Sequence, residues 1–253
     1  MMARNVRHIL FGALLLLFVF NTGCAINESA KKQASYHYQM GLSYLGENNV
    51  TGALVELTAA ERLNPDDPEL LNYLGLAYFR KNKFDLAERK YLRAIELKPT
   101  YSEARNNLGV NYMELKRWDD AVYQLKMVTE DIFYPNQEAA TINLGLAYFG
   151  KGDYPKALSV LRSVVAGNPR DPRARVNLGR VYAALDKYEL AIIEFSRAVE
   201  IDRDYANAHY NLGLAYQKMK DNQAAIAAFR QVVRIAPDSE IGQLSREYID
   251  LLK

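Results

Sequence analysis

Residues 74–78 read "LGLAY", and this short stretch decides the fold because closely related stretches recur along the chain. They are "MGLSY" at 40–44, "LGVNY" at 108–112, "LGLAY" at 144–148, "LGRVY" at 178–182 and "LGLAY" at 212–216. Successive glycines of these stretches are 34, 34, 36, 34 and 34 residues apart. A fixed period of this length is typical of a repeat protein, in which each unit is one supersecondary element that buries its apolar face against its neighbours.

Other positions keep the same phase as these glycines. Twelve residues after each glycine stands an alanine: Ala53, Ala87, Ala121, Ala157, Ala191 and Ala225. Four residues later stands a large apolar or aromatic residue: Leu57, Tyr91, Leu125, Leu161, Phe195 and Phe229. Apolar residues within a unit recur at intervals of three and four, so each half of a unit is predicted to be an amphipathic helix. The small residues are expected where the two helices come closest, with the large ones filling the space around them.

This pattern resembles the tetratricopeptide repeat, which implies an all-α fold, a right-handed α-solenoid of helix pairs. The repeats would span 34–67, 68–101, 102–137, 138–171, 172–205 and 206–239. The third repeat is two residues longer than the others, which accounts for the one spacing of 36. The last stretch, 240–253, has Ile241, Leu244, Tyr248 and Leu251 at helical spacing, which predicts a capping helix over the final repeat. A membrane-binding amphipathic helix is the alternative for this stretch.

The N-terminus has the features of an export signal. Arg4 and Arg7 precede an apolar run at 9–20 that is too short to span a bilayer, and "NTGC" follows with the only cysteine, Cys24. The sequence resembles a bacterial lipoprotein box, although Asn21 stands where leucine is usual. The resemblance implies a signal peptide at 1–23, a covalent lipid on Cys24 and a lipidated linker at 24–33 that reaches on the order of 30 Å when extended. Ala25 in place of aspartate favours the outer membrane, with the repeats facing the periplasm; the alternative is a secreted protein with an incidental cysteine.

Composition argues against several classes of function. Removal of Arg4 and Arg7 leaves 32 − 2 = 30 basic residues against 30 acidic ones, which does not indicate nucleic-acid binding. The sequence shows no catalytic constellation, no metal-ligand pair and no glycine-rich phosphate loop, so neither an enzyme nor a small-molecule substrate, metal or other cofactor is expected. His209 occupies a repeat position usually held by a large packing residue and is predicted to be packed.

Two sets of residues are candidates for a partner-binding groove on the inner surface of the solenoid. One residue before four of the Leu-Gly pairs stand Asn107, Asn143, Asn177 and Asn211, whose amides could hydrogen-bond an extended peptide or could stabilise neighbouring turns. One and four residues after the glycines stand Leu42, Leu45, Leu76, Phe79, Val110, Met113, Leu146 and Phe149. These predict an apolar strip along the first four repeats for an amphipathic or apolar partner segment, unless they only pack against adjacent helices.

The 34-residue period is lengthened by two residues in the stretch 129–138, "TEDIFYPNQE". This insertion distinguishes the chain from a generic repeat protein. Pro135 blocks helix continuation, and Phe133 and Tyr134 are expected to pack over the joint. With the lipoprotein box, the stretch Asp131, Phe133, Tyr134 and Pro135 is similar to the type IV pilus pilotins, the PilF/PilW/Tgl group. That resemblance implies an outer-membrane lipoprotein that binds the secretin subunit of the pilus machine and promotes its ring assembly. The alternative is another envelope scaffold, recruiting peptidoglycan enzymes or outer-membrane assembly machinery, and an enzyme is the least favoured interpretation.

Overall fold

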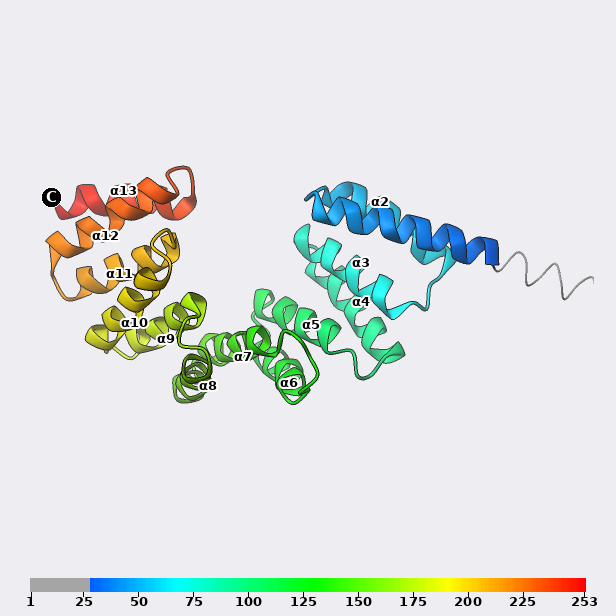
Figure 1. Cartoon of the computed structure of the whole chain (residues 1–253), viewed down its shortest axis with the longest axis horizontal. Coiled ribbons are helices and arrows are strands. Elements are labelled where there is room, and N and C mark those ends of the chain that lie inside the picture. Colours follow the sequence, from blue (N-terminus) through cyan, green and yellow to red (C-terminus); the bar gives the residue numbers. More distant parts are fainter. Residues whose placement is uncertain (1–27) are drawn as a thin grey trace, which may run out of the picture. The chain divides into compact units, whose positions relative to one another are not determined.

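The computed structural model describes residues 28–253, so the predicted signal peptide and Cys24 lie outside the described part of the chain. All regular elements of the described residues are α-helices (Figure 1). The chain divides into two compact units at Asn111 and Tyr112, within helix α5. The predicted all-α architecture is therefore confirmed over residues 28–253, and the two units are described separately below.

The helices alternate between two roles, a first and a second helix of each pair. The first helices are residues 28–46, α3 (Pro68–Arg80), α5 (Ser102–Glu114), α7 (Gln137–Lys151), α9 (Pro172–Ala184) and α11 (Ala206–Lys218). The second helices are α2 (Val50–Leu63), α4 (Phe84–Leu97), α6 (Trp118–Thr129), α8 (Tyr154–Gly167), α10 (Tyr188–Ile201) and α12 (Asn222–Ile235). A final helix, α13 (Glu240–Leu252), packs on α12 and α11, the position expected of a cap.

The helix at residues 28–46 corrects one expectation. Residues 28–33, assigned above to an extended linker, already belong to this helix. A helix rises about 1.5 Å per residue, whereas an extended chain advances about 3.3 Å. This part of the chain therefore reaches about half as far as the extended estimate assumed.

Close approach of the paired helices explains the glycine and alanine positions. A Cβ atom added to Gly179 would lie 2.5 Å from Cε1 of Phe195, and one added to Gly213 would lie 2.6 Å from Cε1 of Phe229. Phe195 and Phe229 are themselves almost fully buried, as is the alanine that precedes each by four residues. The ring of the second helix thus occupies the space that a side chain on the first helix would need.

Each turn between the two helices of a pair contains one residue with positive φ. These residues are Asn48, Asn82, Lys116, Gly152, Asp186 and Lys220, with φ between 57° and 82°. The left-handed conformation reverses the chain within three or four residues, so the second helix can pack directly on the first.

The start of the third, fifth and sixth repeats is tied to the end of the preceding repeat by the same kind of contact. Arg105 Nη2 donates to the carbonyl of Pro99 at 2.8 Å, and Arg175 Nε donates to the carbonyl of Pro169 at 2.8 Å. His209 occupies the equivalent position one repeat later, where Nε2 lies 3.0 Å from the carbonyl oxygen of Arg203. His209 is buried. The structure therefore places it as a packed, hydrogen-bonded residue, as the sequence predicts.

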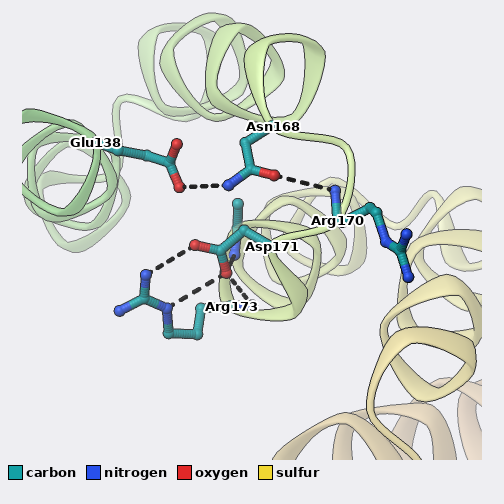
Figure 2. A network of polar contacts seen from close by, with 6 residues as sticks. Glu138, Asn168, Arg170, Asp171 and Arg173 are labelled. Carbon is teal, nitrogen blue, oxygen red and sulfur yellow. Dashed lines mark hydrogen bonds and ion pairs between the residues drawn. The ribbon is translucent and has the colours of Figure 1, made fainter.

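The connection from α8 to α9 in the second unit is held by a polar network (Figure 2). Asn168 Nδ2 donates to Glu138 Oε1 at 3.0 Å, which ties the loop to the start of α7. Asp171 caps α9: its Oδ1 accepts from the backbone N–H groups of Arg173 at 2.7 Å and Ala174 at 3.2 Å, and its Oδ2 accepts from Arg173 Nη2 at 2.8 Å. Burial acts to raise the pKa of Asp171, but these hydrogen bonds outweigh it, and the pKa lies below its ordinary value.

Replacing Asp171 with alanine is expected to lower the free energy of unfolding by about 1–2 kcal/mol at neutral pH, because the cap of α9 is lost. Since the folded-state pKa of Asp171 is depressed, its stabilisation is present above the unfolded-state pKa of about 4 and is lost as the pH falls below it. The difference in free energy of unfolding between wild type and Asp171→Ala is measured by urea unfolding. It should therefore shrink as the pH falls from about 5 to about 3, on either side of that pKa. Asp171→Asn, which keeps an oxygen acceptor, is the matched control and should be less destabilising; a difference that is constant with pH would contradict the assignment.

Candidate partner-binding surfaces

The predicted apolar strip divides between the two units, and its members differ in exposure. In the first unit, Leu45 is 6% exposed and belongs to the core cluster around Ala53 and Leu57. Leu42 and Leu76 are half-buried and pack against that same cluster. Leu45 is therefore a core residue. Leu42 and Leu76 also pack against the core, but part of each side chain stays exposed to solvent.

The remaining strip residues are half-buried as well. Phe79 packs edge-on against Phe84 of the following helix, with ring centroids 5.5 Å apart, and Val110 is half-buried on α5. In the second unit, Met113, Leu146 and Phe149 are half-buried. Partial burial gives each of these side chains an apolar face that a partner could cover.

The four asparagines of the proposed ladder all have contacts within the protein. Asn107 Nδ2 donates to Asn72 Oδ1 at 2.9 Å, and Asn211 Nδ2 donates to the backbone carbonyl of Asn207 at 2.7 Å. Asn177 Oδ1 accepts from Arg180 Nη1 at 3.1 Å, and Asn143 also interacts within the chain. An amide side chain has two N–H donors and an oxygen that accepts twice, so each asparagine can also hydrogen-bond a bound peptide. These asparagines nevertheless already serve the local stabilisation named as the alternative.

The inserted stretch forms a loop between α6 and α7 and corrects a second expectation. Phe133 is 86% exposed and Ile132 is 77% exposed, so Phe133 does not pack over the joint. Tyr134 is half-buried, and Pro135 is exposed. Asp131 organises the loop: its Oδ1 accepts from the N–H of Phe133 at 3.0 Å, and its carbonyl accepts from the N–H of Tyr134 at 3.1 Å. This tight turn directs two neighbouring apolar side chains into solvent.

A concave pocket in the second unit was not anticipated from the sequence. It has a volume of about 300 Å³ and is formed by the first helices α7, α9 and α11 together with the second helix α10, with walls that include Phe149, Phe195 and Leu214. Arg180, Asn211 and Lys218 supply its polar groups. The guanidinium carbon of Arg180 lies 5.1 Å from the centroid of the Phe149 ring, and burial lowers the pKa of Arg180. The sequence signal was the arginine itself, at a repeat position that is otherwise leucine or valine.

Residues 28–253 show neither a metal centre nor a membrane-spanning helix. Within this range no group of three or more His, Cys, Asp and Glu side chains is placed to hold a metal ion. None of the helices described there combines the length and the apolar character needed to cross a membrane.

Comparison with protein families identifies the repeat. Family models described as tetratricopeptide repeat match residues 38–102, 80–135, 139–163 and 206–239, and one described as TPR repeat matches 179–220. Together these matches cover more than half of the chain. The chain belongs to the tetratricopeptide-repeat proteins. A search of the curated proteins gives no match.

Solved tetratricopeptide-repeat structures share the fold of this chain. PilF of Pseudomonas aeruginosa is 20% identical with a TM-score of 0.69, and the similarity covers 87% of this chain and 99% of PilF. PilW, described as a widely conserved type IV pilus biogenesis factor, is 20% identical with a TM-score of 0.75, covering 83% of this chain and 97% of PilW. YrrB, described as a TPR protein with an unusual peptide-binding site, is 21% identical with a TM-score of 0.52, covering 76% of this chain and 97% of YrrB. At these identities the comparisons establish the fold.

Proposed function

We propose that this chain is a type IV pilus biogenesis protein, a pilotin that binds the secretin subunit and promotes its outer-membrane localisation and ring assembly. The observation that carries the proposal is the end-to-end likeness to PilF and PilW, which covers almost the whole of each of those chains. A longer chain from the APC/C hetero-tetramer Cut9-Hcn1 shares the fold as well, but the similarity covers only 46% of that chain. The similarity to YrrB covers almost all of that chain but only 76% of this one, against 87% for PilF and 83% for PilW. The likeness over most of both chains therefore supports the pilus group over repeat proteins in general.

In this proposal, recognition and location are supplied by different parts of the chain. The repeats offer half-buried apolar side chains, such as Leu76 and Leu146, that an amphipathic segment of the secretin would cover. A lipid on Cys24 would hold the protein at the outer membrane, because several acyl chains together anchor a protein stably. The repeats would face the periplasm. No bond is made or broken in such a mechanism, so no catalytic residue or cofactor beyond the lipid is required.

The proposal is tested in a deletion strain of the host by following detergent-resistant secretin rings in the outer membrane. The rings are expected to disappear on deletion and to return with the wild-type gene. Cys24→Ser should restore fewer rings and leave the protein outside the outer-membrane fraction. Normal rings in the deletion strain would exclude the pilotin function and favour another envelope scaffold, such as one recruiting peptidoglycan enzymes.

A binding measurement separates recognition from location. Leu146→Glu is expected to weaken capture of the secretin by at least about tenfold, because a charge would be buried against the apolar partner segment. Leu190→Glu on α10, where the leucine is already 41% exposed, is the matched control and should bind as wild type. Equal binding by both variants would show that the apolar strip is not the contact surface, whatever the deletion strain shows.

A further inference from the structure

Arg180 breaks the repeat pattern at a single inner position. The equivalent residues directly after the repeat glycine are apolar in every other unit: Leu42, Leu76, Val110, Leu146 and Leu214. An arginine here places a permanent positive charge where the fold by itself favours a leucine. Such a local violation of the pattern is expected at functional sites.

The surroundings of Arg180 leave its charge without a carboxylate partner. Its Nη1 donates to Asn177 Oδ1 at 3.1 Å and its guanidinium stacks on Phe149, but no Asp or Glu of the described residues forms an ion pair with it. Arg175, on the same helix α9, is different: its Nη1 lies 2.7 Å from Glu194 Oε2. A partly desolvated guanidinium without a carboxylate partner is costly, and an arriving anion would lower that cost.

The pocket around Arg180 has the charge and the size to bind one acidic group that is flanked by apolar side chains. Its lining contains two cations, Arg180 and Lys218, and no acidic residue. Phe149, Phe195 and Leu214 give it apolar walls, and about 300 Å³ is at the small end of ligand pockets. A highly charged ligand such as a nucleic acid would need more cations than these two. A carboxylate on an otherwise apolar segment fits both the charge and the walls.

We propose that this pocket binds an Asp or Glu side chain of a partner protein segment whose neighbouring residues are apolar. The planar guanidinium of Arg180 would donate two parallel hydrogen bonds to the carboxylate, and the flanking apolar side chains would cover Phe149 and Leu214. The pocket lies entirely in the second unit, between α7, α9, α10 and α11. It shares Phe149 with the apolar strip but adds positive charge that the strip lacks, and it does not require that the partner be a secretin.

The first test is a selection of peptides on the full-length protein in detergent. A library of random 12-residue peptides is displayed within a loop of a carrier, so that no peptide has a free C-terminal carboxylate. Selection on the wild-type protein is expected to enrich Asp or Glu next to Leu, Ile or Phe, and selection on Arg180→Gln is expected to lose that acidic enrichment. Arg230→Gln, an exposed arginine of α12, removes the same charge elsewhere and should keep it. No enrichment on wild type, or equal enrichment on Arg180→Gln, would overturn the proposal.

The second test measures the affinity of the selected peptide and of the same peptide with its acid changed to Gln. Wild type should prefer the acidic form by about 10- to 100-fold, the range for a charge-assisted hydrogen bond, and Arg180→Gln should bind both forms equally. Arg180→Leu, which restores the residue of the other repeats, should lose the preference with a melting temperature no more than about 2 °C below that of wild type. A large fall in melting temperature would instead assign Arg180 a structural role and contradict the proposal.

Discussion

Replacing Phe195 with alanine is expected to lower the free energy of unfolding of the second unit by about 3–5 kcal/mol. Phe195 is 1% exposed, and its ring lies against the backbone of α9 at Gly179, so neighbouring side chains cannot collapse into the space it leaves. The loss is measured by urea unfolding. The fluorescence of Trp118, the only tryptophan of the chain, reports on this unit.

Ile193→Ala is the control on the same helix, since Ile193 is 44% exposed and its truncation leaves no internal cavity. It should cost less than about 1 kcal/mol. Equal losses for the two variants would mean that the ring of Phe195 does not fill a rigid space between α9 and α10.

Replacing Glu194 with alanine is the second change with a large expected effect, about 3–5 kcal/mol in the free energy of unfolding. Glu194 accepts from Arg175 at 2.7 Å in a nearly buried ion pair and from the more exposed Arg197 at 3.3 Å. Without Glu194, the charge of Arg175 stays buried beside a single backbone carbonyl, that of Pro169. The cost comes from this uncompensated charge more than from the lost contact.

A double variant distinguishes these two contributions. Arg175→Leu combined with Glu194→Leu removes both charges and should recover most of the stability lost in the single variant Glu194→Leu, because an apolar pair can replace a buried ion pair at little cost. Thermal unfolding of the four proteins in the cycle provides the measurement. Additive losses, with the double variant the least stable, would show that neither charge is effectively buried.

The helical fold could be predicted from the sequence because its strongest constraints are local. The small residue at Gly179 and the ring of Phe195 are 16 positions apart, and the same pairing returns in every unit. A steric requirement repeated at a fixed interval is visible without any knowledge of the structure. The packed role of His209 followed from its place in that interval in the same way.

The surface features were harder to predict because they depend on loop conformation and on contacts between side chains of different helices. Phe133 is apolar and stands two residues before Pro135, which suggested packing, yet the turn made by Asp131 points it into solvent. The amides of Asn107 and Asn211 could serve a ligand or the protein, and only coordinates show which hydrogen bonds they already make. Arg180 was visible in the sequence as an exception, but the pocket around it is formed by four helices, and their joint arrangement cannot be read from the sequence.

The order of helix contacts has a consequence for how the second unit is made. From α7 to α13, each helix packs on the next one in the chain and, in three cases, on the next but one: α7 with α9, α9 with α11, and α11 with α13. Contacts between near neighbours need only short loops to close, and proteins built from them fold quickly. Assembly of this unit can therefore start at any pair and spread in either direction, and a nascent segment need not wait for a distant one to be synthesised.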